Sequence, residues 1–224
     1  VNRIAKIKAL IELTKIEEIE ALSNAVRACR ICIENPEKAP LPHEPRPVLQ
    51  TSSTARICIS GQAPGTRVHK SGRPFTDPSG DRLRSWMGIW EDVFYDPDLL
   101  AIVPMGFCFP GLDAKGGDLP PRPECRKVWH DRVFAVMPQI ELILVIGQYA
   151  QAYHLGKARK GSLTETVAAW ETYFQESGRS DRPLVLPLPH PSWRNNAWLK
   201  KNPWFEAELL PVLQKEIARL LGRA

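Results

Sequence analysis

The residues whose type and spacing suggest chemistry most directly are the cysteines. Cys29 and Cys32 form a Cys-x-x-Cys pair, and Cys108 and Cys125 follow far downstream. Four thiolates suit either a Zn²⁺ ion or an iron–sulfur cluster, and spacing alone does not separate the two. The fifth, Cys58, lies within a short apolar run, where a small buried hydrophobe is the better explanation. With no secretory signal in the sequence, a disulfide framework is not expected.

A second candidate is the loop Gly61-Gln62-Ala63-Pro64-Gly65, which follows an apolar, β-branched run over residues 55–60. A helix is expected to begin near residues 79–81. A strand, a glycine turn and a helix in succession place a ligand at the carboxyl end of a sheet. Glycines there let backbone N–H groups approach an anion or a planar ring. An ordinary βα loop has the same pattern, so the loop alone does not decide.

Alternating strands and helices must position these loops. Apolar runs predict strands over 55–60, 99–104, 142–146 and 184–188. Helical spacing predicts helices over 81–89, 124–136, 148–155 and 203–221. The alternation predicts an α/β fold in which a parallel sheet has helices on both faces.

Three segments fall outside that alternation. Residues 1–30 predict one or two amphipathic helices that lead into the first cysteine pair, and residues 34–53 predict a proline-rich extended connection over the surface. Residues 111–123 predict a proline–glycine loop that is either functional or disordered. We therefore expect an N-terminal arm over 1–54 and an α/β domain over 55–224, which together form one structural unit.

The overall composition restricts the class of protein. The 224 residues are 43% hydrophobic and 25% charged, with no apolar run as long as a membrane span. These features predict a cytoplasmic globular protein without membrane association. A net charge of +5 and a pI near 9.0 are compatible with a nucleic-acid partner but do not require one. No Gly-x-Ser-x-Gly elbow of an α/β hydrolase is present.

Four features in order along the chain resemble the uracil-DNA glycosylase superfamily. They are the loop at residues 61–65, the segment Gly72-Arg73-Pro74-Phe75, the segment His190-Pro191-Ser192, and the four spaced cysteines. The resemblance runs from about Cys29 to Leu213, and it is closest to the iron–sulfur branches first known from thermophiles, of which this chain would be a divergent member.

The resemblance implies a three-layer α/β/α fold with a four-stranded parallel sheet and a cleft at the carboxyl ends of the strands. It also implies base flipping, in which a damaged base is extruded from DNA into a pocket. Cys29, Cys32, Cys108 and Cys125 would hold a structural [4Fe–4S] cluster, with Zn²⁺ as the alternative. We expect the protein to act as a monomer.

The same resemblance assigns roles in the pocket. Phe75 matches the aromatic residue that stacks on the flipped base, with Ala63, Pro64 and Gly65 beside it. His190 matches the histidine that hydrogen-bonds the pyrimidine carbonyl and stabilises the departing anion, as an oxyanion-hole donor does.

The residues after His190 match the DNA-contacting segment of the family. Ser192 corresponds to a phosphate contact, and Trp193, Arg194 and Asn195 follow where relatives insert a side chain into the gap left by the base. For Trp193, packing against a helix is an equally good explanation.

The chain departs from the family pattern at the first loop. Relatives usually carry a carboxylate at the position of Gln62 or Ala63, and here those residues offer an amide and a methyl group. Gln62 can position a water molecule but cannot act as a base. Asp77, or His69 as the nearest group that titrates near neutral pH, would supply the missing electrostatics.

A second departure concerns the base. Uracil-specific relatives place an asparagine about four residues before the third cysteine, where this chain has Pro104. The sequence therefore predicts a hydrolase that excises uracil, hypoxanthine or xanthine in base-excision repair. A catalytically silent nucleic-acid-binding relative that keeps the fold and the cluster is the alternative.

Overall fold

The computed structural model describes residues 2–177 and 182–223, and the side chains of residues 13–175 and 182–223. At its centre lies a sheet of four parallel strands in the order β2-β1-β3-β4. The strands are β1 (Ile57–Ser60), β2 (Leu100–Ile102), β3 (Leu142–Ile146) and β4 (Leu184–Leu188). The predicted parallel sheet and α/β class are confirmed.

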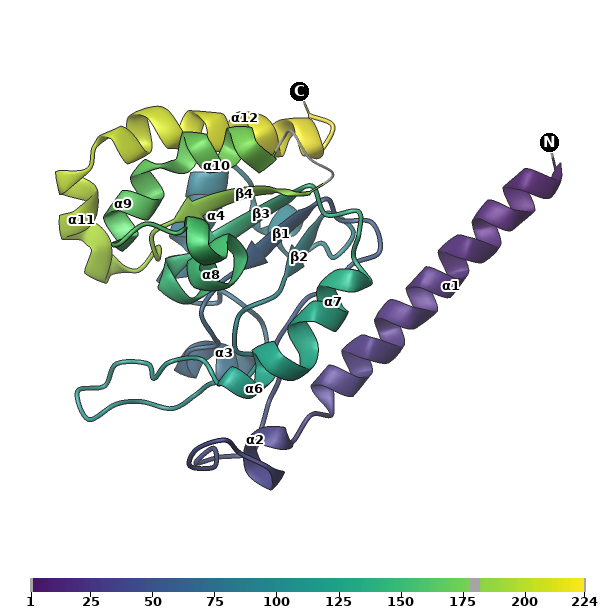
Figure 1. Cartoon of the computed structure of the whole chain (residues 1–224), viewed down its shortest axis with the longest axis horizontal. Helices are drawn as coiled ribbons and strands as arrows, with labels where there is room; N and C mark the ends of the chain where they lie inside the picture. The colour runs from purple at the N-terminus through teal and green to yellow at the C-terminus, as the bar shows by residue number, and fades with distance from the viewer. Residues whose placement is uncertain (1, 178–181, 224) are drawn as a thin grey trace.

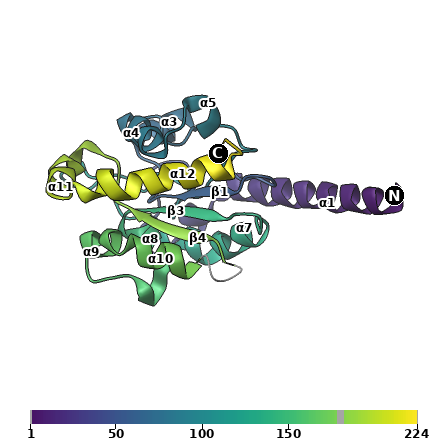
Figure 2. The same ribbon diagram turned by 90° about the horizontal axis from the view of Figure 1, so that it is seen from above.

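Helices cover both faces of this sheet (Figures 1 and 2). Between β1 and β2 lie α3 (Thr66–Ser71), α4 (Pro78–Met87) and α5 (Glu91–Phe94). Before β3 lie α6 (Pro123–Cys125), a π-helical turn η1 (Arg126–His130) and α7 (Asp131–Ala135). Between β3 and β4 lie α8 (Gly147–Leu155), a 3₁₀ turn η2 (Gly156–Ala158), α9 (Leu163–Ala168) and α10 (Trp170–Ser177). After β4 lie a 3₁₀ turn η3 (Trp193–Asn195), α11 (Asn196–Lys201), a π-helical turn η4 (Phe205–Leu209) and α12 (Leu210–Leu220).

The two apolar layers follow from the alternation of side chains along each strand. Ile57 and Ile59 face the layer that contains α4 and α12, where Leu83 and Leu213 are fully buried. Cys58 lies between them and faces the opposite layer, formed by α1, α7 and α8. Burial on both faces explains why the strands read as continuous apolar runs in the sequence.

The N-terminal arm is one long helix, α1 (Asn2–Arg27), followed by the short α2 (Ile31–Glu34). Its first turns extend away from the sheet (Figures 1 and 2), whereas Leu22 and Val26 near its end are buried beside Trp129. The proline-rich connection then runs along the free edge of β2, where Gln50 forms an antiparallel bridge with Ile102. This contact covers an edge that would otherwise expose unpaired backbone groups.

The proline–glycine segment after β2 is an ordered hairpin. Leu112 pairs with Asp118 in an antiparallel bridge, and the backbone N–H of Asp113 donates to the carbonyl of Gly117. The Asp113 carboxylate in turn accepts the N–H groups of Lys115 and Gly117, which closes the turn. Of the two alternatives that the sequence left open, disorder is therefore wrong.

The π-helical turn η1 interrupts what the sequence predicts as one regular helix. It adds a residue to the turn, so the consecutive residues Trp129 and His130 are both buried. The ring of His130 stacks on Phe107 and lies near two carbonyl oxygens, those of Cys125 and Pro104. In the part of the chain that the structure describes, no helix is long and apolar enough to cross a membrane.

Candidate active site

A cavity with about 600 Å³ of empty space, partly open to solvent, lies at the carboxyl ends of the strands. Each strand contributes to its wall: Gly61 follows β1, Ile102 ends β2, Ile146 ends β3 and His190 follows β4. The connections from β1 and β3 leave in opposite directions, and such a switch point is where open α/β sheets bind ligands.

The first loop forms one wall of the cavity, as predicted for Gln62, Ala63, Pro64 and Gly65. Its backbone is fixed by the segment after β2, because Gly106 N–H donates to the carbonyl of Gln62. No side chain at Gly106 would fit comfortably, since a Cβ there would lie 3.2 Å from that of Ala63. The loop is therefore a preformed wall.

Phe75 lines the cavity in a strained backbone conformation, with φ of 53°. Its ring packs edge-on against Phe94. The hydroxyl of Tyr95 donates to the carbonyls of Pro74 and Phe75, at 2.8 and 3.1 Å, and so holds the strained segment. An aromatic face fixed in a cavity in this way suits stacking on a planar ring.

His190 lines the cavity. A backbone contact within its own loop determines which ring nitrogen carries the proton in the neutral form. The backbone N–H of Ser192 donates to Nδ1 of His190 at 3.2 Å, so in the neutral ring the proton is on Nε2. Burial lowers the pKa of His190, while the nearby Asp77 and Asp118 act in the opposite direction. A neutral imidazole that carries its proton on Nε2 is a hydrogen-bond donor for charge developing in the cavity.

The residues after His190 lie beside the cavity, outside its lining. Arg82 of α4 donates to the carbonyl of Ser192 at 3.0 Å, and the amide of Asn195 donates to the carbonyl of His190 at 2.7 Å. Asn195 therefore fixes the loop, whereas Trp193 is 73% exposed and Arg194 is also exposed. Of the predicted DNA contacts, these two have the most freely accessible side chains.

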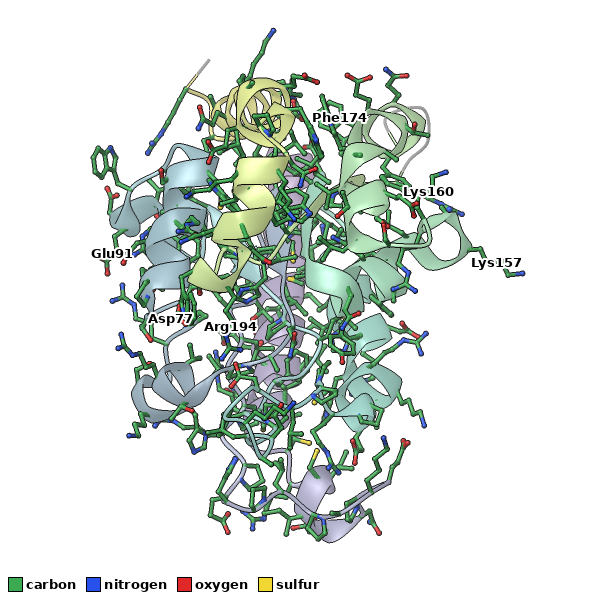
Figure 3. The ribbon with its side chains drawn as sticks, turned by 90° about the vertical axis from the view of Figure 1, so that its left-hand side faces the viewer. Asp77, Glu91, Lys157, Lys160, Phe174 and Arg194 are labelled. Carbon is green, nitrogen blue, oxygen red and sulfur yellow. The ribbon has the colours of Figure 1, made fainter. Side chains whose placement is uncertain are left out.

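Two carboxylates line the cavity, and the sequence predicted only one of them. Asp77 precedes α4 and accepts a hydrogen bond from the hydroxyl of Ser79. Asp118, which the sequence analysis missed, reaches the cavity from the 111–119 hairpin and interacts electrostatically with Arg194 and His190. Figure 3 views the face of the molecule on which Asp77 and Arg194 lie.

His69 is not part of the cavity lining, although the sequence suggested it as a source of electrostatics. The centre of its ring lies 4.4 Å from that of His43 and 5.8 Å from that of Phe109. Burial, His43 and Arg46 all lower its pKa. The nearest histidine in the sequence is thus not the nearest to the site, and we assign His69 no catalytic role.

The four spaced cysteines gather away from the cavity, where the end of α1, α2, the segment after β2 and α6 meet. Cys32, Cys108 and Cys125 are buried and Cys29 is half-buried. A hydrogen bond from Cys125 lowers the pKa of Cys32 to about 7, while the same contact and burial raise that of Cys125. Cys108 interacts with Cys29 and Cys32.

The surroundings of these sulfurs act in two directions: burial raises the pKa of Cys108 to about 12, whereas N–H donors are directed at three of the sulfurs. Three of the four accept a hydrogen bond from an N–H group, a feature that stabilises metal-bound thiolates. The donors are the indole of Trp129 to Cys29 at 3.3 Å, the backbone of Phe107 to Cys125 at 3.4 Å, and the backbone of Arg46 to Cys108. Within residues 2–177 and 182–223, however, no three His, Cys, Asp or Glu side chains are arranged to hold a single metal ion.

The sequence model of the uracil DNA glycosylase superfamily matches residues 49–214, which include every strand and every wall of the cavity except Val48. The chain belongs to the uracil-DNA glycosylase superfamily. The predicted relationship is therefore confirmed.

The two positions at which the sequence departs from the superfamily pattern can now be located in the structure. The wall formed by the first loop presents an amide at Gln62 and a methyl group at Ala63, with the amide directed to the carbonyl of Leu119 at 3.4 Å. Pro104 lines the cavity, and its carbonyl lies 3.0 Å from Nε2 of His130. That carbonyl thus faces a residue outside the cavity lining, and Pro104 offers no donor with which to read a base.

The superfamily match covers only half of the cysteine set. Cys108 and Cys125 lie within residues 49–214, whereas Cys29 and Cys32 lie before them. The cavity thus belongs, apart from Val48, to the shared domain, and the cysteine centre joins that domain to the N-terminal arm.

Proposed function

We propose that this protein is a DNA glycosylase that flips a deaminated base into the cavity and hydrolyses its N-glycosidic bond. The observation that carries the proposal is the hydrogen bond from the Ser192 N–H to Nδ1 of His190 in the cavity, which leaves Nε2 as the donor of the neutral ring, and burial lowers the pKa of His190. When the glycosidic bond breaks, negative charge develops on the departing base, and a fixed N–H donor lowers the energy of that charge. Membership in the superfamily supports the same reaction type.

Phe75 would stack on the flipped base. Unstacking a base from DNA costs a few kcal/mol, and contact with an aromatic face offsets part of that cost. The strained φ of Phe75 and the hydrogen bonds from Tyr95 hold the ring in place before the base arrives. Gln62 would hold the attacking water molecule, and Asp77 would add negative charge on the sugar side of the cavity.

DNA would approach along the segment after His190. Ser192 would contact a phosphate, and the exposed ring of Trp193 is free to enter the gap left by the base. Arg194 adds positive charge at the mouth of the cavity. We propose that the protein acts as a cytoplasmic monomer in base-excision repair.

Pro104 restricts the choice of base that the cavity could recognise. Uracil recognition in relatives depends on an amide at this position, and a proline cannot replace its hydrogen bonds. Hypoxanthine and xanthine therefore belong in the same assay as uracil.

We propose that Cys29, Cys32, Cys108 and Cys125 hold a [4Fe–4S] cluster, with Zn²⁺ as the alternative. The N–H donors to three of the sulfurs support bound thiolates. The group would supply structural cross-linking of the arm to the sheet. Iron and zinc analysis of anaerobically purified protein, together with its visible absorption, distinguishes the two: a colourless preparation that contains only zinc would contradict the cluster.

A second candidate function is a catalytically silent nucleic-acid-binding relative. The amide and methyl group at Gln62 and Ala63 favour it, because the usual first-loop carboxylate is missing. It differs from the first in one measurable property, since it binds DNA without producing abasic sites.

The deciding experiment is single-turnover excision from single- and double-stranded oligonucleotides that contain uracil, hypoxanthine or xanthine. We expect His190→Ala to lower the rate by about 10²-fold or more, as loss of one transition-state donor does, with unchanged DNA affinity. His43→Gln, which alters a histidine outside the cavity, is the matched control and should keep wild-type activity. Salt-dependent DNA binding with no product from any substrate would instead favour the silent relative.

A further inference from the structure

The hydrolysis leaves one requirement that the first loop cannot meet. Positive charge develops on the sugar as the base departs, and the attacking water must lose a proton. Both needs are usually met by a carboxylate. Gln62 and Ala63 provide neither a negative charge nor a base, so the group must come from another part of the chain.

The 111–119 hairpin brings a carboxylate to the wall formed by the first loop. An oxygen of Asp118 lies 3.5 Å from the position that a Cβ on Gly65 would occupy. Asp118 lines the cavity together with Gln62 and His190, although the residue as a whole is exposed to solvent. The carboxylate absent from the first loop in sequence is therefore present beside that loop in space.

Several contacts hold the hairpin in this position. The side chain of Gln62 donates to the carbonyl of Leu119, and the N–H of Leu119 donates to the carbonyl of Gly111 at 3.0 Å. Further along, Pro121 packs against Gly106, where an added Cβ would be only 3.0 Å from the proline ring. Asp118 is thus held by ordered backbone on both sides.

The carboxylate of Asp118 is also uncommitted. Among the residues that the structure describes, no donor forms a hydrogen bond or an ion pair with it, whereas Asp77 accepts the hydroxyl of Ser79. Burial raises the pKa of Asp118, with Arg194 and His190 opposing that shift and Asp77 and Asp113 adding to it. A raised pKa makes a carboxylate a stronger base.

We propose that Asp118 is the catalytic carboxylate of this site, and that it orients the attacking water and accepts its proton. This proposal rests on the proposed glycosylase function. The C1′–N bond breaks, and its electron pair leaves with the base, whose negative charge meets Nε2–H of His190. The water oxygen forms the new bond to C1′ while one of its protons passes to Asp118. The base anion then takes a proton from solvent and Asp118 releases the proton that it accepted to solvent, which leaves a free base, an abasic sugar and the restored carboxylate.

The test compares Asp118→Asn with Asp113→Asn in single-turnover excision by the full-length protein. Asp113→Asn removes a carboxylate from the same hairpin but keeps an oxygen for the N–H groups of Lys115 and Gly117, so it is the matched control. We expect Asp118→Asn to slow excision by about 10²-fold or more without weakening DNA binding. The control should retain the wild-type rate, and both variants should match the wild type in circular dichroism and melting temperature.

The pH profile provides a second measurement that a purely structural role would not affect. The wild-type rate should fall as pH drops and Asp118 takes up a proton, with a midpoint above the ordinary aspartate range. This acidic limb should vanish in Asp118→Asn.

The outcomes separate the two proposals. Excision by the wild type with equal rates for Asp118→Asn and Asp113→Asn would overturn the role of Asp118 and leave the glycosylase function standing. Failure of the wild type to excise any of the three bases would overturn the glycosylase function and the role of Asp118 together.

Discussion

The cavity and the cysteine centre are held in place in different ways. The cavity is built from short loops at the ends of four buried strands, and the two large apolar layers lie directly behind it. The cysteine centre gathers four segments outside the sheet: Cys125 and Cys29 pack at the edge of one large layer, whereas Cys32 and Cys108 lie in a small cluster that, among the described residues, otherwise contains Leu41 and Ile33. The sheet can therefore hold the cavity without help, whereas the half of the cysteine centre around Cys32 and Cys108 has little apolar surface of its own.

The two regions share one stretch of chain. It starts at Cys108, passes through Asp118 at the cavity and returns to Cys125. A change at the cysteine centre should therefore loosen one wall of the cavity but leave the sheet intact. The predictions below test this contrast, from the largest expected effect to the smallest.

The largest effect is expected from Cys125→Ser. If the proposed cluster is present, loss of one ligand should release it and unfold the arm, because structural metal sites contribute on the order of 10 kcal/mol to folding. Iron content should fall, and hydrogen exchange should accelerate over residues 29–50 while β1 and β3 stay protected. Cys58→Ala changes the cysteine inside the sheet and should retain its iron. Equal iron contents in wild type and Cys125→Ser would refute the assignment of this ligand.

The next effect concerns the cavity itself. A Cβ added at Gly80 would lie 1.9 Å from the carbonyl oxygen of Phe75, so Gly80→Ala must displace that backbone. We expect a loss of about 1–3 kcal/mol in the free energy of unfolding and slower excision. Gly61→Ala is the control, because its Cβ would meet the Phe75 ring at an ordinary 3.6 Å. Denaturant unfolding measures both, and equal stabilities would contradict the packing described here.

Lowering the pH should reduce the free energy of unfolding through His154 of α8. Burial and the neighbouring His130 lower the pKa of His154 to about 3, while an unfolded histidine titrates near 6.5. Between these values the unfolded chain binds the proton and the folded protein does not, so stability falls as pH drops. The loss attributable to His154 at pH 5 is about 2 kcal/mol, which His154→Phe should remove. Unfolding curves at pH 7.5 and 5.0 provide the comparison, and identical pH dependence in both proteins would argue against this role.

The smallest effect is expected from Tyr95→Phe. This change removes the hydroxyl that donates to the carbonyls of Pro74 and Phe75 but keeps the ring. We expect a loss of about 1 kcal/mol in stability and a modest fall in excision rate. A variant as stable and as active as the wild type would mean that the strained conformation of Phe75 is held by other contacts.

The sequence predicted the sheet well, because a strand covered on both faces needs an unbroken apolar run. Residues 142–146 show this most clearly, and they form β3 in full. The short helices α3, α9 and α10 were missed because they have too few turns for a clear periodicity. One signal was available: Ser162 and Glu165 form a capping box at the start of α9.

The site was predicted in part. The family resemblance assigned His190 and Phe75 to the pocket, and both line the cavity. Asp118 could not be placed from the sequence, since its position depends on how a hairpin packs against Gly106 and Gln62. His69 lies outside the cavity lining, because distance along the chain does not determine where its ring packs, which is beside His43.

The π-helical turn η1 bears on how related sequences should be compared with this one. Such a turn holds one more residue than an α-helical turn would, and the helix continues on both sides of it. A relative without that extra residue would keep Cys125 and the face of α7 in place but lose one position between them. Alignments should therefore admit a single-residue gap within 126–130, and a relative with that gap would not bury two consecutive side chains there.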